Sequence, residues 1–503
     1  MTQTILKART LPADCGESLR IAVLYDTNST HVGTIKEHLE SFERYLRHSI
    51  TFIPGSSSYW LRAPNDISHN IDLSIFDAVI VHYSIRLSLA DHLDEGLAKA
   101  VEKFNGLKLL FIQDEYECTE IARSWMDRLK FDVVYTCVPQ ESLEYVYPSY
   151  RFPETEFLPT LTGYVPEDPA LEGYSIPLQE RKLLIAYRGR KLPAVYGELG
   201  QEKYRIGVEM KNIAGIHGLP VDVEVDESKR IYGTAWYRFL GSARATLGTE
   251  SGANVFDFDG SLRAEIRRLE AENPEITFEE ISAKVLAPHE GRVLMNQISP
   301  KIFEAIRLRT ALVLFEGSYS GVVFPYEHYI PLKKDFSNID EVLAKLEDDE
   351  YLQSLTERAY QDIVASGKYS YKSFVEGIDA DIKHRLLHCN THTRLLRSLY
   401  VMQRDGSLKQ ALPAIPIGIS SGPHPLGRPL SHHELLEFIP DAPFPQSVIS
   451  SIYINIKMRS FLRIRARHAL RVAFPMNSLS GRFLRMVWTR LPILGSNKQK
   501  RSN

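Results

Sequence analysis

The sequence NQISPKIFEA at residues 296–305 could bind the phosphate and ribose groups of a nucleotide. Ser299 suits the N-cap of a helix, and Pro300 suits the first helical position, where no intrahelical donor is needed. The free amides of the first turn and the positive end of the helix dipole would face an approaching phosphate. Lys301 adds a positive charge, and Glu304, about one turn further on, could accept hydrogen bonds from a ribose diol. An ordinary capped amphipathic helix running into a buried strand would have the same pattern, so that alternative stays open.

Two other groups of polar residues follow predicted strands, where a ligand can approach the edge of a sheet. The run Arg188-Gly189-Arg190-Lys191 comes directly after the apolar run 183–187 and could neutralise a diphosphate leaving group. The alternative is a solvated basic turn. The run Thr249-Glu250-Ser251-Gly252 follows the run 245–248, and its amides could bind phosphate or sugar oxygens, although small residues also follow strands simply because the chain turns.

The segment 296–305 resembles the nucleotide-binding segment of GT-B glycosyltransferases. In many retaining members of that family two glutamates flank seven residues, and an alanine follows the second glutamate. Here Glu304 and Ala305 match the second glutamate and the alanine, whereas Asn296 stands in the place of the first. The later Gly and Pro of the family pattern are replaced by Arg309 and Ala311. An amide at 296 can hydrogen-bond a sugar hydroxyl but carries no charge, so retaining or inverting stereochemistry stays open.

The resemblance implies two Rossmann-like domains and a nucleotide diphosphate sugar as the donor substrate. It also implies that an Arg and a Lys of the second domain, here Arg190 and Lys191, balance the charge of the diphosphate. Several inverting members carry a catalytic base in the loop after the first strand, the place that His31 occupies here. An imidazole near its usual pKa can take a proton from an acceptor hydroxyl. Asp114 and Glu115, which end another predicted strand, are the rival bases, and a surface polar role is the alternative for each.

Two sequence patterns have residues of the kind that bind metal ions. For both patterns we favour a role that involves no metal ion. Asp257-Phe258-Asp259 is a DxD sequence of the kind that GT-A glycosyltransferases use to hold a divalent cation, but short acidic pairs also arise by chance. His384, His388 and His392 recur every four residues, which would place them on one helix face, yet no carboxylate completes a zinc site. We therefore predict no metal and no cofactor beyond the donor substrate.

Composition excludes several classes of protein. The chain has no GxGxxG after its first strand and no GxxxxGK[ST], which disfavours a nicotinamide dehydrogenase and a P-loop NTPase. Its four cysteines are scattered without a CxxC pair, as expected in a reducing compartment. No apolar run is long enough to span a membrane, and the first residues do not form a signal peptide.

The net charge of −3 conceals a marked asymmetry. Residues 442–503 hold twelve of the 60 Lys and Arg residues and no acidic residue, so the first 441 residues carry −15. Within this tail four arginines recur every fourth residue from Arg459 to Arg471, near aromatic side chains such as Phe461 and Trp488. A basic amphipathic segment of this kind suits an anionic lipid surface. RNA or DNA is the competing partner, but a basic tail on an acidic enzyme-like body favours the membrane.

Alternating apolar runs and helical patterns predict two doubly wound α/β units that face a cleft. The expected divisions are a tail (1–18), an acceptor domain (19–151), a linker (152–180), a nucleotide-sugar domain (181–385), a helix with a Pro-rich linker (386–449) and a basic amphipathic tail (450–503). A charged helix over about 261–284 is expected as an insertion.

Together these features predict a cytoplasmic glycosyltransferase, peripheral at the inner membrane face through residues 450–494. It would move a sugar from a nucleotide diphosphate sugar to a glycan or lipid-linked acceptor, with use in surface polysaccharide synthesis, and bind no nucleic acid. A GT-B fold sugar-nucleotide epimerase and a non-catalytic nucleotide-sugar-binding protein are the alternatives, because a fold alone does not fix a function.

Overall fold

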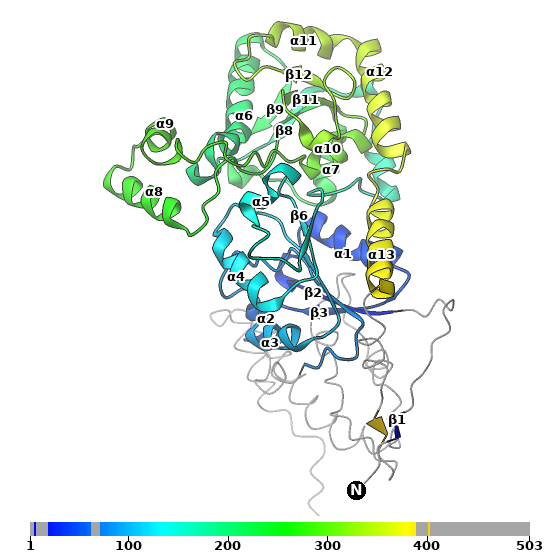
Figure 1. The fold of residues 1–503 in the computed structure, drawn as a ribbon. Helices are drawn as coiled ribbons and strands as arrows, with labels where there is room; N and C mark the ends of the chain where they lie inside the picture. The colour runs from blue at the N-terminus through cyan, green and yellow to red at the C-terminus, as the bar shows by residue number, and fades with distance from the viewer. Residues whose placement is uncertain (1–4, 7–18, 62–70, 389–400, 403–503) are drawn as a thin grey trace, which may run out of the picture. The chain divides into compact units, whose positions relative to one another are not determined.

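The structure is a computed structural model that describes residues 5–6, 19–61, 71–388 and 401–402 of the 503-residue chain. The described chain folds into two parallel β-sheets built from alternating strands and helices (Figure 1). The two sheets, each with its helices, form the first and second α/β units and lie together in one compact body. The predicted pair of Rossmann-like α/β units is confirmed. The predicted basic tail lies outside the described residues.

The first sheet has six strands in the order β3-β2-β4-β5-β6-β7, and every neighbouring pair is parallel. Its strands are apolar on both faces: in β2, Ala22 and Leu24 pack on one side of the sheet while Ile21 and Val23 pack on the other. Such strands require helices on both sides. The strands are β2 (Arg20–Tyr25), β3 (Ser49–Pro54), β4 (Ala78–Val81), β5 (Leu107–Phe111), β6 (Val133–Thr136) and β7 (Glu156–Pro159).

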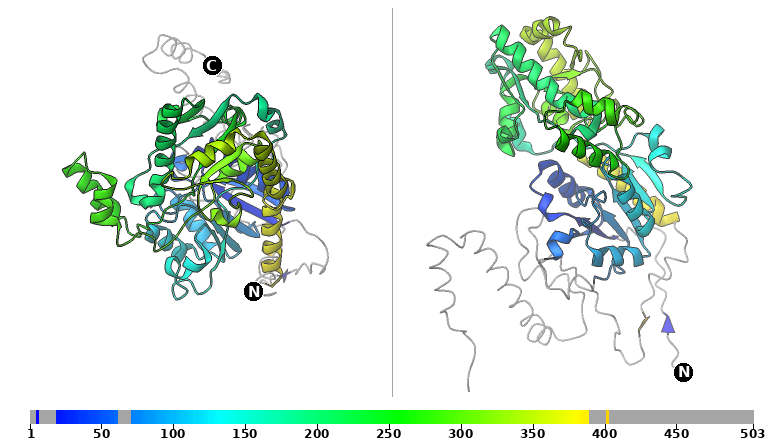
Figure 2. Two further views of the ribbon diagram at one scale, coloured as in Figure 1. Left: turned by 90° about the horizontal axis from the view of Figure 1, so that it is seen from above. Right: turned by 90° about the vertical axis from the view of Figure 1, so that its left-hand side faces the viewer.

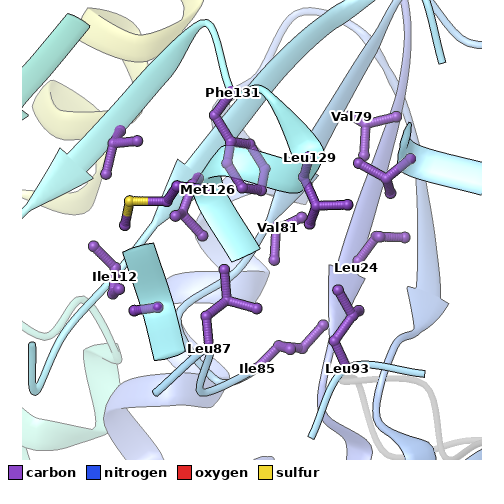
Figure 3. Close-up of a cluster of buried hydrophobic side chains, with 14 of the residues drawn as sticks. Leu24, Val79, Val81, Ile85, Leu87, Leu93, Ile112, Met126, Leu129 and Phe131 are labelled. Atoms are coloured by element: carbon purple, nitrogen blue, oxygen red, sulfur yellow. The ribbon is translucent and has the colours of Figure 1, made fainter. Parts of the chain in front are cut away.

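One face of the first sheet packs against α3 and α4, where Leu24 and Val81 meet Met126 and Leu129 of α4 (Figure 3). The other face packs against α1 and α13. Although α13 follows the second sheet in the chain, it lies beside α1, and the two views of Figure 2 agree with this (Figures 1 and 2). The helices of this unit are α1 (Gly33–Tyr45), α2 (Ser57–Trp60), α3 (Glu95–Lys103), α4 (Thr119–Leu129), α5 (Leu143–Val146) and α13 (Tyr371–His388).

The return of α13 to the first sheet follows from its apolar residues. Val375, Ile378, Ile382 and Leu386 recur at helical spacing and are all buried in the same cluster as β2 and α1. The predicted linker 152–180 also contributes to this sheet, because β7 within it pairs with β6.

The second sheet has five parallel strands in the order β12-β11-β10-β8-β9. In β11, Leu312 and Leu314 face the cluster built by α7 and α10, while Val313 and Phe315 face the cluster built by α6, α11 and α12. The elements are β8 (Leu183–Arg188), α6 (Gly197–His217), β9 (Val221–Glu224), α7 (Thr234–Gly241), β10 (Ala243–Gly248), α10 (Pro300–Arg307), β11 (Ala311–Phe315), β12 (Ile330–Leu332), α11 (Ile339–Glu347) and α12 (Asp349–Ala359).

Between β10 and α10 the chain forms a lobe that stands out from the sheets in Figure 2. The expected charged helix is divided into α8 (Ser261–Glu272) and α9 (Phe278–Ile281), because Pro274 interrupts it and Thr277 starts a new helix with a capping box. Val255, Ile266 and Leu286 belong to a small core that the lobe shares with Val195, just before α6. The segments that lead into and out of the lobe join the core of the first sheet through Phe256, Val293 and Met295.

Among the residues that the structure describes, none of the helices combines the length and the apolar character needed to cross a lipid bilayer.

Candidate functional site

The candidate site lies at the carboxyl end of the second sheet, where the strand order reverses. β8 lies between β9 and β10. After β8 the chain passes to α6 on one face of the sheet, and after β10 it passes through the lobe to α10 on the other face. Open α/β sheets bind ligands at such a switch point, because loops leaving in opposite directions make room there. The predicted donor-binding segments 188–191, 249–252 and 296–304 all follow or adjoin this point.

Two lysines meet at the end of β8. Lys301, in the first turn of α10, donates from Nζ to the carbonyl oxygen of Arg188 at 2.8 Å. Lys203, in α6, donates from Nζ to Oγ of Ser251 at 2.7 Å, and its own carbonyl oxygen accepts from the hydroxyl of Tyr187 at 2.8 Å. Segments that are far apart in the sequence therefore bring two ammonium groups to one place.

The charges at this place repel one another. Desolvation by the surrounding protein and, after it, the positive charges of Lys301 and Arg190 lower the pKa of Lys203 to about 8. Lys301 is exposed to solvent, yet desolvation lowers its pKa to about 8 as well; Arg230 and Arg190 act in the same direction, and Glu304 acts against them. The positive charges of Arg190 and Arg230 thus act on the lysines, although Arg230 is itself paired with Glu227 at 2.6 Å.

The basic residues of the run 188–191 differ in their contacts and exposure. Arg188 forms an ion pair with Asp222 at 2.8 Å and lies over the ring of Phe239, 4.2 Å from its centroid. It therefore links β8 to β9 and α7. Arg190 and Lys191 are exposed, and the charge of Arg190 reaches both lysines of the site.

Glu304 lies one turn into α10, beside Lys301. Its Oε2 accepts from Nε1 of Trp236 at 2.7 Å, and burial raises the pKa of this carboxyl group. The neighbouring residue of α7, Tyr237, hydrogen-bonds to Glu37 of α1, in the first unit. Burial and, after it, the negative charge of Glu304 raise the pKa of Glu37 to about 8. Trp236 and Tyr237, which are consecutive in α7, thus bind the carboxyl groups of Glu304 and Glu37.

The start of α10 matches the prediction in position but not in every contact. Pro300 is its first residue and Ser299 occupies the N-cap, yet the Ser299 side chain makes no capping hydrogen bond. The preceding residue, Ile298, is instead held on both sides: its amide donates to Oγ of Ser320 at 3.0 Å, and its carbonyl oxygen accepts from Thr162.

The predicted loop after β10 turns its side chains in different directions. Glu250 is buried and binds Asn296 and the loop after β11, rather than facing solvent. Ser251 pairs through its backbone with Gln297 and contacts Lys203 through its hydroxyl. Gly252 has φ +116°, and a Cβ atom there would lie 2.0 Å from the carbonyl oxygen of Met295, so this position requires glycine.

The first sheet contributes Asp114, in the loop that follows β5. Its side chain is exposed and accepts from the hydroxyl of Tyr116 at 2.7 Å. Its backbone lies in the left-handed region, with φ +58°, where non-glycine residues are uncommon and often functional. The negative charge of Asp114 acts to raise the pKa of Lys203. The carboxyl ends of the two sheets therefore face each other at these two residues.

The other two candidate bases lie in different surroundings. Glu115 is fully buried, where its carboxylate accepts from the amide of Cys137 at 3.0 Å and from the hydroxyl of Thr136; burial raises its pKa to about 7. His31 is exposed, and its Nδ1 lies 2.8 Å from the carbonyl oxygen of Asn28. The structure places neither side chain beside Lys203 or Lys301.

The two acidic residues of the DxD sequence precede α8 and bind amides of its first turn. Asp257 is buried and accepts from the amides of Leu262 and Arg263, at 3.2 and 3.0 Å. Asp259 accepts from the amide of Ser261 at 3.0 Å. Within residues 19–61 and 71–388 no group of three metal-binding side chains converges. Of the predicted histidine row, His392 lies outside the described residues.

Sequence reasoning missed Lys203, Arg230 and Glu37. Because α6 begins at Gly197, Lys203 lies about two turns inside the helix that follows the first strand of the second unit. A lysine in the helix that follows this strand could have been predicted to lie near the strand's carboxyl end, where ligands bind. Glu37 and Arg230 interact with residues that are distant in sequence, so no local pattern indicates them.

The comparisons with known proteins concern structure only, since no protein-family model and no curated protein matches the chain. The chain is similar to Anabaena Alr3699/HepE in complex with UDP, with 10% identity and a TM-score of 0.43 over 73% of this chain and 100% of that one. It is similar to an alpha-glucosyltransferase in complex with UDP and a 13-mer DNA, with 11% identity and a TM-score of 0.43 over 73% of this chain and 99% of that one.

TarM is a further structural neighbour, with 12% identity and a TM-score of 0.34 over 62% of this chain. The match covers 54% of TarM, so this chain spans about half of its length.

Proposed function

We propose that the chain transfers a sugar from a nucleotide diphosphate sugar to an acceptor hydroxyl. The observation that carries this proposal is the convergence of Lys203, Lys301, Arg190 and Arg230 at the switch point of the second sheet. Desolvation and, after it, the mutual repulsion of these positive charges lower the pKa values of the two lysines. A diphosphate, which brings several negative charges and many acceptor oxygens, relieves that repulsion better than a single carboxylate would.

The surroundings of the cationic cluster suit the rest of a nucleotide. Glu304 follows Lys301 by about one helical turn, so a ligand with its phosphates at the lysines would place its ribose hydroxyls near this carboxylate. Trp236 fixes the carboxylate through Oε2 and leaves Oε1 for such hydroxyls. The amides at the start of α10 add further donors for phosphate oxygens.

The reaction needs a proton acceptor opposite the diphosphate, and we assign this role to Asp114. In the transfer, the bond from the anomeric carbon of the sugar to the phosphate oxygen breaks, and a bond to the acceptor oxygen forms. Asp114 takes the proton of the acceptor hydroxyl, and Lys203 and Lys301 balance the charge that develops on the leaving diphosphate. The exposed carboxylate of Asp114 and its approach to Lys203 support this assignment.

For the acceptor we propose a glycan or a lipid-linked sugar, with residues 450–494 holding the enzyme against an anionic membrane. The support is the sequence of the tail, in which basic residues without any acidic ones alternate with apolar and aromatic residues. Attachment by such a segment would keep the site close to a membrane-bound acceptor.

Calorimetric titration with UDP, GDP and ADP, followed by UDP-glucose, UDP-galactose and GDP-mannose, tests the function. The wild-type protein should bind at least one nucleoside diphosphate, and a Lys203→Met, Lys301→Met variant should lose that affinity. Lys211→Met is the matched control, because Lys211 lies on the same helix and pairs with Glu224 at 2.9 Å away from the site. Equal affinity in all three proteins, or no binding by the wild type, would overturn the proposal.

A further inference from the structure

Glu250 connects three segments behind the proposed donor site. Its side chain is buried, with 3% of the residue exposed. Oε1 accepts from the amide of Ser318 at 2.8 Å, from the hydroxyl of Ser318 at 2.9 Å and from the amide of Tyr319 at 2.8 Å. Oε2 accepts from Nδ2 of Asn296 at 2.6 Å. One carboxylate thus joins the loop after β10, the loop after β11 and the segment that leads into α10.

Each of these segments contacts the site through a neighbour. Ser251, next to Glu250, binds the ammonium group of Lys203, and Ser320, next to Tyr319, binds the amide of Ile298 just before α10. The carboxylate is packed closely in place: a Cβ atom on Gly317 would lie 2.6 Å from Cδ of Glu250. A change at Glu250 would therefore be felt at Lys203 and at the start of α10.

The carboxylate also decides the orientation of the Asn296 amide. An ionised carboxylate can only accept hydrogen bonds, so the amide must turn its NH₂ group toward Glu250 and its oxygen away. That oxygen, Oδ1, is buried and has no hydrogen-bond partner among the residues that the structure describes. The contact with Glu250 therefore holds the Asn296 amide in one orientation, with an acceptor oxygen that no described group uses.

We propose that Glu250 is a positioning residue of the donor site. It does not touch the nucleotide; it fixes Ser251 beneath Lys203, sets the loop that holds the start of α10, and fixes the orientation of the Asn296 amide. This inference rests on the proposed function, because it assigns Glu250 to the site that binds the nucleotide diphosphate.

Glu250→Gln tests this role with no change of shape. The three donors from Ser318 and Tyr319 require the glutamine oxygen at Oε1, so its NH₂ group must replace Oε2 and would then face the NH₂ group of Asn296. The amide of Asn296 must reverse or the two segments must separate. Nucleoside diphosphate binding, titrated with UDP, GDP and ADP in a calorimeter, should weaken about tenfold or more, as expected when a buried donor loses its acceptor.

A second substitution, at Asn296, should restore the hydrogen bond and the nucleotide affinity that Glu250→Gln removes. In Glu250→Gln, Asn296→Asp the donor and acceptor are exchanged across the same contact, the net charge is unchanged, and the new carboxylate at position 296 again presents an acceptor oxygen. We expect its affinity to return to within about threefold of the wild type. Asp379→Asn controls for loss of stability, because Asp379 is a buried carboxylate that binds Lys383 and the amide of Arg47, distant from the site in the other unit. It should lower the unfolding temperature but leave nucleotide affinity unchanged.

The outcomes separate the two proposals. If the wild type binds none of the three nucleoside diphosphates, the proposed function fails and this inference fails with it. If the wild type binds and Glu250→Gln binds equally well, only the positioning role is overturned. Failure of the exchanged pair to bind better than Glu250→Gln alone would also overturn it, whatever the unfolding temperatures show.

Discussion

Raising the pH from 7 to 9 should weaken nucleoside diphosphate binding, because it removes the charge of Lys203 and Lys301. Both lysines have pKa values lowered to about 8 in the free protein. A bound diphosphate favours the charged form and raises those values, so binding above pH 8 requires proton uptake. The sign is fixed: affinity is fully present below pH 8 and is lost as the pH rises through it.

The magnitude follows from the fraction of charged lysine in the free protein. For one group with a pKa of 8 that stays charged when bound, affinity falls about tenfold between pH 7 and pH 9, or about 1.4 kcal/mol. Two independent lysines would give about a hundredfold. Because Lys301 is exposed and solvent screens its interactions, we expect an overall loss nearer to tenfold.

Calorimetry at pH 7, 8 and 9, in two buffers of different ionisation enthalpy, measures both the affinity and the protons taken up. Lys203→Arg, Lys301→Arg is the matched variant, since guanidinium groups stay charged throughout this range and should give a flat profile. A wild-type affinity that is constant from pH 7 to 9 without proton uptake would refute the reasoning. So would an equal loss in the arginine variant.

Three further predictions concern separate parts of the account. Glu304→Ala should weaken nucleotide binding by about 1–3 kcal/mol, measured by calorimetry, because a ribose hydroxyl loses its acceptor; unchanged affinity would remove Glu304 from the site. Asp114→Asn should lower kcat about a hundredfold or more while leaving nucleotide affinity within about twofold; loss of affinity with normal turnover would contradict its role as the base. Full-length protein should sediment with anionic vesicles and a version ending at 449 should not, with salt weakening the attachment; equal behaviour of both proteins would exclude the membrane role of the tail.

The sheets could be predicted from the sequence because their central strands are buried on both faces. The run 311–315 is apolar throughout and the run 107–112 is apolar apart from Lys108, and the structure contains β11 and β5 there. β7 was missed because its four residues are only half buried or exposed, so no apolar run marks it. The start of α6 has no clear helical pattern, because its first two turns contain two glycines, Gly197 and Gly200, which disfavour a helix.

The candidate site could be outlined from the sequence only in part, for a related reason. Lys301 and Glu304 were found because they share one helix, where spacing alone fixes their separation. Lys203 and Lys301 come together only because α6 and α10 pack on the same sheet. The sequence alone does not show how close these two helices lie. Asp257 resembled a metal ligand because the pattern DxD does not distinguish a cation site from the capping of α8, which only its backbone partners reveal.

Incubating the wild-type protein with UDP-glucose, UDP-galactose and GDP-mannose, and measuring release of the nucleoside diphosphate, tests the central claim most directly. Each reaction is run with and without a lipid-linked glycan acceptor, and with the Lys203→Met, Lys301→Met variant beside the wild type. The account predicts that at least one sugar nucleotide is consumed by the wild type, faster with acceptor, and that the lysine variant loses this activity. Turnover by the lysine variant at the wild-type rate, or the absence of release from every donor with acceptor present, would contradict it.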